Sequence, residues 1–437
     1  MKKLISMLVI LIIIFCAFPI TAGASYKTTG FEVKSEVALL VSLDTGDAIY
    51  EKNADEKRYP ASITKVMTAV LLIENCTDLT QEVTVTKENY ESLLGSELVV
   101  ANLVPGEKVT LEACLNMLLV RSAADAANVI VDYVEKTTGK DFIELMNNKA
   151  KELKMNNTHF TNATGLHDDN HYTTAKDLVK LCKYAINLPN FLNICSQYTY
   201  TIPKTNKHDS WSVSTTNHLL NPYSGSLYYP YARGIKTGFT TPAGACVVST
   251  ASKDGYNYLC VIMGGDRDTN TQFTDSAALY KWAFSDFEYR TVASTDTMIS
   301  EMDVELSNET DFVQLYPEKN VTVIMPKGIT NESIIYDPVL KENSVWAPIE
   351  KGQILGYVSI KCAGKEIAKV NLVNNYEVKR STWLYICEIA KGIFTSTWFI
   401  VIAVFLVLIL ISLISVNIVS NKRKRARLKR VKKIKKL

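Results

Sequence analysis

An uncharged run near the end of the chain, residues 398–419, restricts the fold more than any other feature of the sequence. As a helix this run is about 33 Å long, roughly the thickness of a bilayer core. Backbone groups inside a bilayer must be hydrogen-bonded within the protein, and a single segment can achieve this only as a helix. We therefore expect a transmembrane helix over residues 393–419, with Trp398 at the outer interface.

The charges that follow this run indicate its orientation. The last 17 residues carry 11 Lys and Arg and no acidic residue. Without these and Lys2 and Lys3, 35 basic side chains remain against 45 acidic ones. A basic tail could bind nucleic acid, but Lys and Arg directly after a span are typical of its cytoplasmic side. We expect a basic cytoplasmic tail over residues 420–437 and no nucleic-acid partner.

The N-terminus resembles a secretory signal peptide. Lys2 and Lys3 precede an apolar stretch over residues 4–20, and the small residues Ala22-Gly23-Ala24 follow. This pattern predicts a signal peptide over residues 1–24, with an uncleaved membrane anchor as the alternative. Together the two ends predict a single-pass protein of the cell membrane whose main domains are extracellular.

The residues between the two ends suggest two domains, the first of the α+β class. Strand patterns over residues 36–50 and 245–263 enclose helix patterns, and a further helix is expected over residues 276–287. This order fits an antiparallel sheet, with strands from both ends, packed against a helical block. Short alternating strands over residues 304–378 predict a small all-β domain. The helices expected inside the block are residues 60–75, 111–120, 123–136, 141–153 and 175–186.

The cysteines do not suggest a disulfide framework or a metal site. Seven of the nine lie between residue 76 and residue 362, scattered and odd in number, and none has metal-ligand spacing. Buried free thiols are therefore expected, although Cys246 and Cys260 could be neighbours across a hairpin.

Ser62 and Lys65 form the most informative local motif. They are three residues apart at the start of an expected helix, so both lie on one face. A serine hydroxyl needs a base to become a nucleophile, and a buried lysine can be that base when burial favours its neutral amine. One or two such pairs are expected by chance in a chain of this length, but this Ser-x-x-Lys is the only one present.

Two further motifs could belong to the same site. Lys236-Thr237-Gly238-Phe239 contains the only Lys-Thr-Gly and stands on an expected edge strand, which can pair with an extended peptide. Lys236 and Thr237 offer a charge and a hydroxyl to a carboxylate. Ser122 lies between two helices, where it could relay a proton or simply cap a helix.

In this order the three motifs resemble those of the penicillin-binding protein and serine β-lactamase superfamily. The closest resemblance is to low-molecular-mass penicillin-binding proteins, which are serine-type D-alanyl-D-alanine carboxypeptidases. Further matching segments are Val104-Pro105-Gly106-Glu107, Gly165-Leu166-His167-Asp168, His171-Tyr172-Thr173-Thr174-Ala175 and Gly264-Gly265. The resemblance implies a β-lactamase/transpeptidase-like carboxypeptidase domain over residues 28–290 and a small β-sandwich-like domain over residues 295–380.

The resemblance also implies a mechanism and a set of partners. The enzyme would remove the terminal D-alanine of peptidoglycan stem pentapeptides through an acyl-enzyme, which β-lactams would also form. No metal or cofactor is implied, and the catalytic domain would be extracellular. The implied roles are nucleophile for Ser62, general base for Lys65, proton relay for Ser122, and substrate binding for Lys236, Thr237, Gly238 and Phe239. The backbone N–H groups of Ser62 and Phe239 would form the oxyanion hole.

One departure from the family pattern leaves alternatives open. The family's Ser-x-Asn reads Ser122-Ala123-Ala124, so the asparagine amide is missing. A degenerate member that binds peptidoglycan with little turnover is therefore one alternative. A serine β-lactamase is another, although a second β domain and a membrane span have no evident use in such an enzyme. His218 could border the same cleft.

Overall fold

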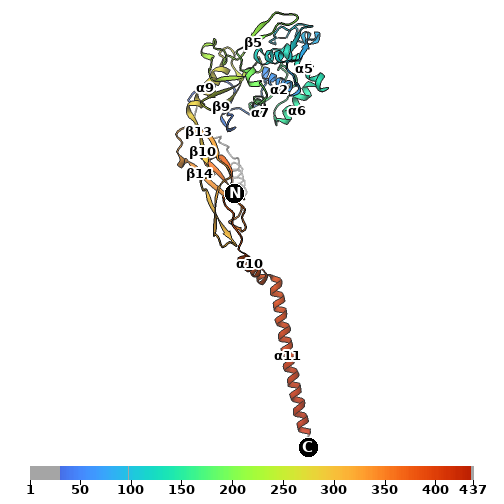
Figure 1. Ribbon diagram of the computed structural model, residues 1–437, viewed down its shortest axis with the longest axis vertical. Helices are drawn as coiled ribbons and strands as arrows, with labels where there is room; N and C mark the ends of the chain where they lie inside the picture. The colour runs from blue at the N-terminus through green and yellow to red at the C-terminus, as the bar shows by residue number, and fades with distance from the viewer. Residues whose placement is uncertain (1–29, 97, 435–437) are drawn as a thin grey trace, which may run out of the picture. The chain divides into compact units, whose positions relative to one another are not determined.

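The computed structural model describes residues 30–96 and 98–434. The chain divides into two compact units. The first contains the described residues up to Arg290 together with Thr322–Asn331, and the second contains Thr291–Val321 and the described residues from Glu332 onward (Figure 1). The expected signal peptide, residues 1–24, lies outside the described residues.

The first unit is built on a five-stranded antiparallel sheet in the order β2-β1-β9-β8-β7. The sheet combines strands from both ends of the domain, as the sequence predicted, and β1 pairs with β9. The edge position of β7 leaves one side of this strand unpaired within the sheet. The strands are β1 Val37–Ser42, β2 Ala48–Lys52, β7 Ala232–Thr240, β8 Gly244–Lys253 and β9 Tyr256–Gly265.

Side chains of β1 alternate between two hydrophobic cores, because successive residues of a strand point to opposite faces. Val37, Leu39 and Val41 join the larger core, which contains the residues of the helical block. Ala38 and Leu40 join the smaller core, to which α9 (Thr271–Asp286) contributes. All six residues of β1 are buried, which explains why this strand reads as a continuous apolar run.

The helical block carries most of the expected helices, with three changed boundaries. The helix expected over residues 60–75 begins as the 3₁₀ turn η1, and the one over residues 111–120 ends in the π turn η2. The helix expected from residue 276 begins at Thr271, after Asn270 in the left-handed region. The elements are η1 Ala61–Thr64, α2 Lys65–Asn75, α3 Lys87–Glu91, α4 Leu111–Asn116, η2 Met117–Arg121, α5 Ala124–Thr138, α6 Phe142–Glu152, α7 Ala175–Ala185, α8 Phe191–Cys195 and η3 Gly225–Leu227. Two small hairpins accompany them, β3 Glu82–Thr84 with β4 Lys108–Thr110 and β5 Thr199–Ile202 with β6 Trp211–Ser214.

Every cysteine in the described part of the chain is a free thiol, and six of them are buried. The expected proximity of Cys246 and Cys260 was wrong. Cys260 pairs in register with Ser249, and the two thiols belong to different cores on opposite faces of the sheet.

The second unit is mainly β-structure, which confirms the expected small all-β domain. Its six-stranded sheet has the order β14-β16-β17-β12-β11-β15. A separate two-stranded sheet pairs β10 with β13. The elements between residue 287 and residue 374 are β10 Phe287–Ala293, β11 Ser300–Glu305, β12 Phe312–Pro317, β13 Val321–Pro326, η4 Asn331–Ser333, β14 Ile334–Leu340, β15 Ser344–Trp346, β16 Ile354–Cys362 and β17 Lys365–Asn374.

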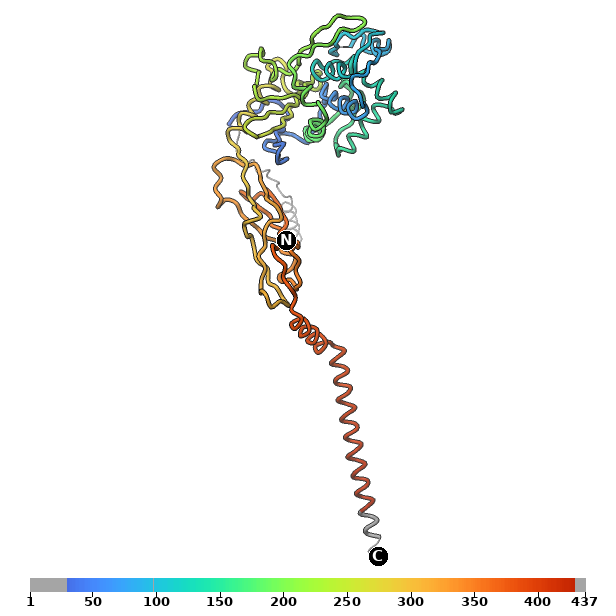
Figure 2. Tube along the Cα trace, in the orientation of Figure 1, coloured from blue at the N-terminus to red at the C-terminus, as the bar shows by residue number. Residues whose placement is uncertain are grey.

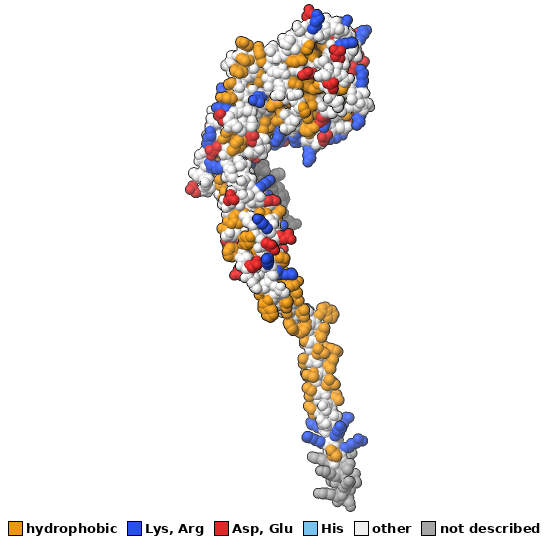
Figure 3. Space-filling view, viewed as in Figure 1, with side chains coloured by type: hydrophobic (Ala, Val, Ile, Leu, Met, Phe, Trp, Pro, Cys, Tyr) orange, Lys and Arg blue, Asp and Glu red, His pale blue; other side chains and the backbone are white. Residues whose placement is uncertain are grey.

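Two helices end the chain. Figure 2 shows α10 (Thr382–Thr395) leading directly into the long α11 (Thr397–Ile434). Ser396 is extended and separates them, so the long helix begins at Thr397 and not at the expected residue 393. Within the described residues α11 is the one helix long and apolar enough to cross a membrane. Apolar side chains cover it until the Lys and Arg side chains begin (Figure 3).

Candidate active site

Ser62 and Lys65 lie at the junction between η1 and α2. Lys65 Nζ is 3.0 Å from Ser62 Oγ and donates a second hydrogen bond to the backbone oxygen of Thr164 at 2.6 Å. The lysine is fully buried although it begins a helix, because α2 is buried along most of its length. The spacing of the motif therefore gives a direct contact between hydroxyl and amine.

Burial changes the protonation of both lysines of the site. Burial lowers the pKa of Lys65 to about 7, although the charge of Asp125 acts in the opposite direction. Burial also lowers the pKa of Lys236 well below its ordinary value, and the nearby positive charge of Lys65 adds to this effect. Lys65 can therefore accept a proton near neutral pH, and a carboxylate bound at Lys236 would favour its charged form.

Strand β7 approaches the nucleophile turn very closely at Gly238. A Cβ atom at this position would lie 2.9 Å from the backbone oxygen of Pro60 and 3.0 Å from the nitrogen of Ser62. Such distances leave no room for a side chain. Glycine at position 238 is therefore required for the edge strand to pack against η1, and this packing places Thr237 beside the cleft that contains Ser62.

The turn between η2 and α5 presents Ser122 to the same cleft. Ser122 is in the left-handed region, with φ of 70°, and is almost fully buried. The alternative role as helix N-cap was wrong, because Ala123 holds that position and no side chain caps the helix. Ala124, where the family has asparagine, is completely buried, and its N–H donates to the backbone oxygen of Val99 at 2.8 Å.

A cleft of about 450 Å³ is lined by the predicted residues other than the two buried lysines, Lys65 and Lys236. Lys65 reaches it through Ser62, and Lys236 lies on β7 next to Thr237. His218 lines the cleft as expected, with its Nδ1 2.8 Å from Ser224 Oγ. The lining residues are Ser62, Val99, Arg121, Ser122, Thr215, Thr216, His218, Thr237, Gly238, Phe239, Ala245, Cys246, Arg267, Asn270, Gln272 and Phe273.

Several of these lining residues were not predicted from the sequence. The hydroxyl of Thr216 is 2.5 Å from that of Thr237. Gln272 is 6% exposed, and its Oε1 has no hydrogen-bond partner among the described residues, so the side chain is available to a ligand. Arg267 stacks on the ring of Phe239 at 4.3 Å. In the sequence, only the nearby Gly264-Gly265 motif and the segment around His218 indicated that these regions could belong to the site.

His171 supports the turn that carries the nucleophile. The backbone N–H of Thr161 donates to its Nδ1 at 3.1 Å, so Nε2 carries the proton and donates to Thr64 Oγ1 at 2.7 Å. The Thr64 hydroxyl in turn donates to the oxygen of Ala61 at 2.8 Å. Burial lowers the pKa of His171 to about 4, which keeps the ring neutral at pH 7. The residue is thus a core hydrogen-bonding histidine.

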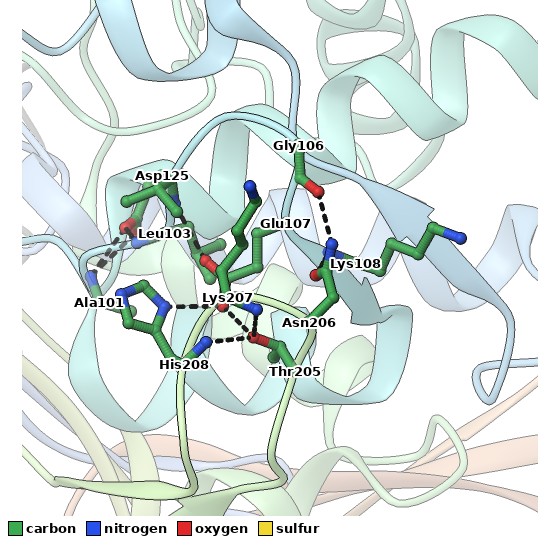
Figure 4. Close-up of polar contacts among 11 residues, drawn as sticks. Ala101, Leu103, Gly106, Glu107, Lys108, Asp125, Thr205, Asn206, Lys207 and His208 are labelled. Atoms are coloured by element: carbon green, nitrogen blue, oxygen red, sulfur yellow. Dashed lines mark hydrogen bonds and ion pairs between the residues drawn. The ribbon is translucent and has the colours of Figure 1, made fainter.

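A second network holds the segment before β4 against α5 and the β5–β6 connection (Figure 4). Asp125 accepts hydrogen bonds at 3.0 Å from the N–H groups of Ala101 and Leu103. The fully buried Glu107 contacts Thr205 Oγ1 at 2.7 Å and His208 Nδ1 at 2.9 Å. These contacts fix the segment that contributes Val99 to the cleft. The described residues contain no cluster suited to a metal ion.

The fold and the Ser62–Lys65 pair together define a serine peptidase of the penicillin-binding type. Residues 23–267 match the family model for D-alanyl-D-alanine carboxypeptidase, and residues 287–380 match the model for the C-terminal domain of penicillin-binding protein 5. The first match covers more than half of the chain. The protein belongs to the D-alanyl-D-alanine carboxypeptidase family, which confirms the family, fold class and enzyme class expected from the sequence.

Individual relatives agree with this assignment. The chain is 28% identical to D-alanyl-D-alanine carboxypeptidase DacF of Bacillus subtilis over 91% of its own length and 100% of the relative's. It is 29% identical to DacC of Escherichia coli, covering 82% and 88% of the two chains. Among solved structures, penicillin-binding protein 5 from Haemophilus influenzae is 25% identical with a TM-score of 0.65, covering 81% of this chain and 100% of that one.

Proposed function

We propose that this protein removes the terminal D-alanine from peptidoglycan stem pentapeptides through an acyl-enzyme at Ser62. The observation that carries the proposal is the 3.0 Å contact between Ser62 Oγ and a buried Lys65 whose pKa is lowered to about 7. A neutral lysine can take the hydroxyl proton as the oxygen attacks the carbonyl carbon between the two D-alanines. The positive end of the helix that begins at this point favours the developing negative charge.

The rest of the cycle uses the other residues of the cleft. The terminal carboxylate binds Lys236 and the hydroxyl of Thr237, which Thr216 orients. Ser122 passes a proton to the nitrogen of the departing D-alanine, and the C–N bond breaks. Backbone N–H groups of Ser62 and Phe239 hold the carbonyl oxygen, which the close approach of β7 to Ser62 at Gly238 allows, and the substrate strand pairs with β7. Water then attacks the ester, and Ser62 regains its proton.

D-alanine release tests this proposal directly. The purified full-length protein in detergent should release D-alanine from a stem pentapeptide, and Ser62→Ala should abolish the release without changing the melting temperature. A retained rate in Ser62→Ala would contradict the assignment of the nucleophile. Normal labelling by a penicillin without any D-alanine release would instead favour the binding-module alternative, which the missing asparagine at position 124 motivates.

We also propose that α11 anchors the enzyme in the cell membrane as a single span, with the carboxypeptidase domain (residues 28–290) and the β domain (residues 295–380) outside. The apolar length of α11 and the Lys and Arg residues after it support this orientation. Protease added to intact cells should release an active soluble fragment and leave the basic tail protected. Digestion of the tail from outside would contradict the orientation.

A further inference from the structure

Two arginines line the cleft without an acidic partner in the described part of the chain. Arg121 ends η2, is exposed, and forms no ion pair there. Arg267 contacts the ring of Phe239 through a cation–π interaction but also has no acidic partner. By contrast, Arg58 and Arg290 are paired with glutamates. The two cleft guanidiniums therefore remain available to charges on a ligand.

Among the described residues that line the cleft, no acidic side chain offsets these charges. None of its described lining residues is Asp or Glu, whereas His218, Asn270 and Gln272 add polar groups that can donate hydrogen bonds. A cleft lined by positive charges raises the local concentration of anionic ligands and favours their binding. The site is thus suited to a substrate that carries more than one negative charge.

The terminal carboxylate of the proposed substrate accounts for the positive charge on and beside β7, but not for Arg121. Its terminal carboxylate is bound by Lys236 and Thr237, and Arg267 stays close to that strand because it stacks on Phe239. Arg121 belongs to a different element, immediately before Ser122, and no described contact fixes its guanidinium. Because the peptide ends at its terminal carboxylate, any second carboxylate must be on the acyl side of the scissile bond.

We propose that Arg121 binds a second carboxylate, carried by the side chain of the residue that precedes the two D-alanines. This inference rests on the proposed function and makes Arg121 a specificity-determining residue. The preferred substrates are peptides whose third residue has a free side-chain carboxylate, such as diaminopimelate, and not peptides in which this group is amidated or absent. A guanidinium suits this role because it can donate two parallel hydrogen bonds to a carboxylate.

Matched peptides test the proposal on the full-length protein. N-acetyl-diaminopimelyl-D-Ala-D-Ala with a free side-chain carboxyl group is compared with the same peptide carrying a carboxamide there. We expect kcat/KM for D-alanine release to be about tenfold higher with the free carboxylate, the usual size of one charge-assisted interaction. Arg121→Gln should remove this preference by slowing only the carboxylate peptide, and Arg121→Lys should restore part of it. Arg233→Gln is the matched control, since Arg233 is exposed on β7 outside the cleft lining.

The outcomes separate this proposal from the proposed function. Equal rates for the two peptides in the wild type, or a preference that survives Arg121→Gln, would overturn the assignment while D-alanine release itself stands. Loss of the preference in Arg267→Gln and not in Arg121→Gln would also overturn it. If turnover is too slow to measure, the two peptides can compete with a fluorescent penicillin for Ser62. The peptide with the free carboxylate should then inhibit the labelling more strongly than the carboxamide peptide. Failure of the penicillin to label Ser62 would contradict both proposals.

Discussion

Lys65 Nζ lies 3.0 Å from Ser62 Oγ, so a fully buried amine contacts the serine hydroxyl directly. The pair exists because η1 and α2 meet between these residues, so the hydroxyl lies on the 3₁₀ turn and the amine on the first residue of the α-helix. Complete burial of the lysine then keeps its pKa near neutrality, which a solvent-exposed lysine would not show.

The rate of acylation should rise with pH through this pKa. Below pH 7 the amine of Lys65 is protonated and cannot accept the proton of Ser62, so kcat/KM should fall about tenfold per pH unit. Above pH 7 the rate should level off as the neutral amine predominates. The measurement is penicillin labelling between pH 5 and pH 8.5, where a flat profile would contradict the role of Lys65. Lys65→Arg, which stays charged, should be slow throughout.

Gly238→Ala should nearly abolish acylation. The added Cβ would meet the backbone oxygen of Pro60 at 2.9 Å, so β7 and the nucleophile turn must move apart. A displacement of about 1 Å between reacting groups costs roughly 100-fold in rate. Gly392→Ala is the control, because Gly392, like Gly238, does not have positive φ and nothing lies within 4 Å of its added Cβ. Equal labelling rates in the two variants would show that the close approach is not needed.

Restoring the family asparagine in Ala124→Asn should not raise the rate of acylation or of D-alanine release. The methyl group of Ala124 is completely buried and does not line the cleft, so Ala124→Asn must displace packed neighbours. Overpacking of this kind typically costs about 1–3 kcal/mol in the free energy of unfolding. We expect a lower melting temperature, slower penicillin labelling and slower D-alanine release. Faster D-alanine release would instead mean that the space beside Ala124 can hold an asparagine side chain without displacing its neighbours.

Gln272→Leu should separate ligand binding from stability. The buried Oε1 of Gln272 lacks a partner in the described structure, so an apolar side chain of similar size should keep or raise the stability. If the amide contacts the substrate, KM for the pentapeptide should rise severalfold at the same time. Thermal unfolding and steady-state kinetics on one preparation measure both effects. An unchanged KM would exclude the amide from substrate binding.

The sequence predicted those parts of the site that depend on local spacing. Ser62 and Lys65 meet because they are three residues apart across η1 and the start of α2, and the hairpin signal that follows Lys236 and Thr237 correctly placed both on a strand. Thr216 could not be predicted, because its contact with Thr237 joins residues 21 positions apart through tertiary packing.

The start of α9 and the backbone conformation of Ser122 could not be predicted from the sequence pattern either. Ser122 fits a helix N-cap by composition, yet its left-handed conformation gives that position to Ala123. The first turn of α9 was missed because it contains the polar residues Thr271, Gln272 and Thr274, which interrupt the apolar pattern. Gln272 in this turn is buried although it lines the cleft.

Mass spectrometry after brief exposure to a penicillin tests the central claim most directly. The β-lactam carbonyl should be attacked by the serine that Lys65 activates, giving one penicilloyl group per protein. We expect peptide mapping to place this adduct on Ser62, and Ser62→Ala to remain folded and unlabelled. An adduct on any other serine, or none on the folded wild-type protein, would contradict the account.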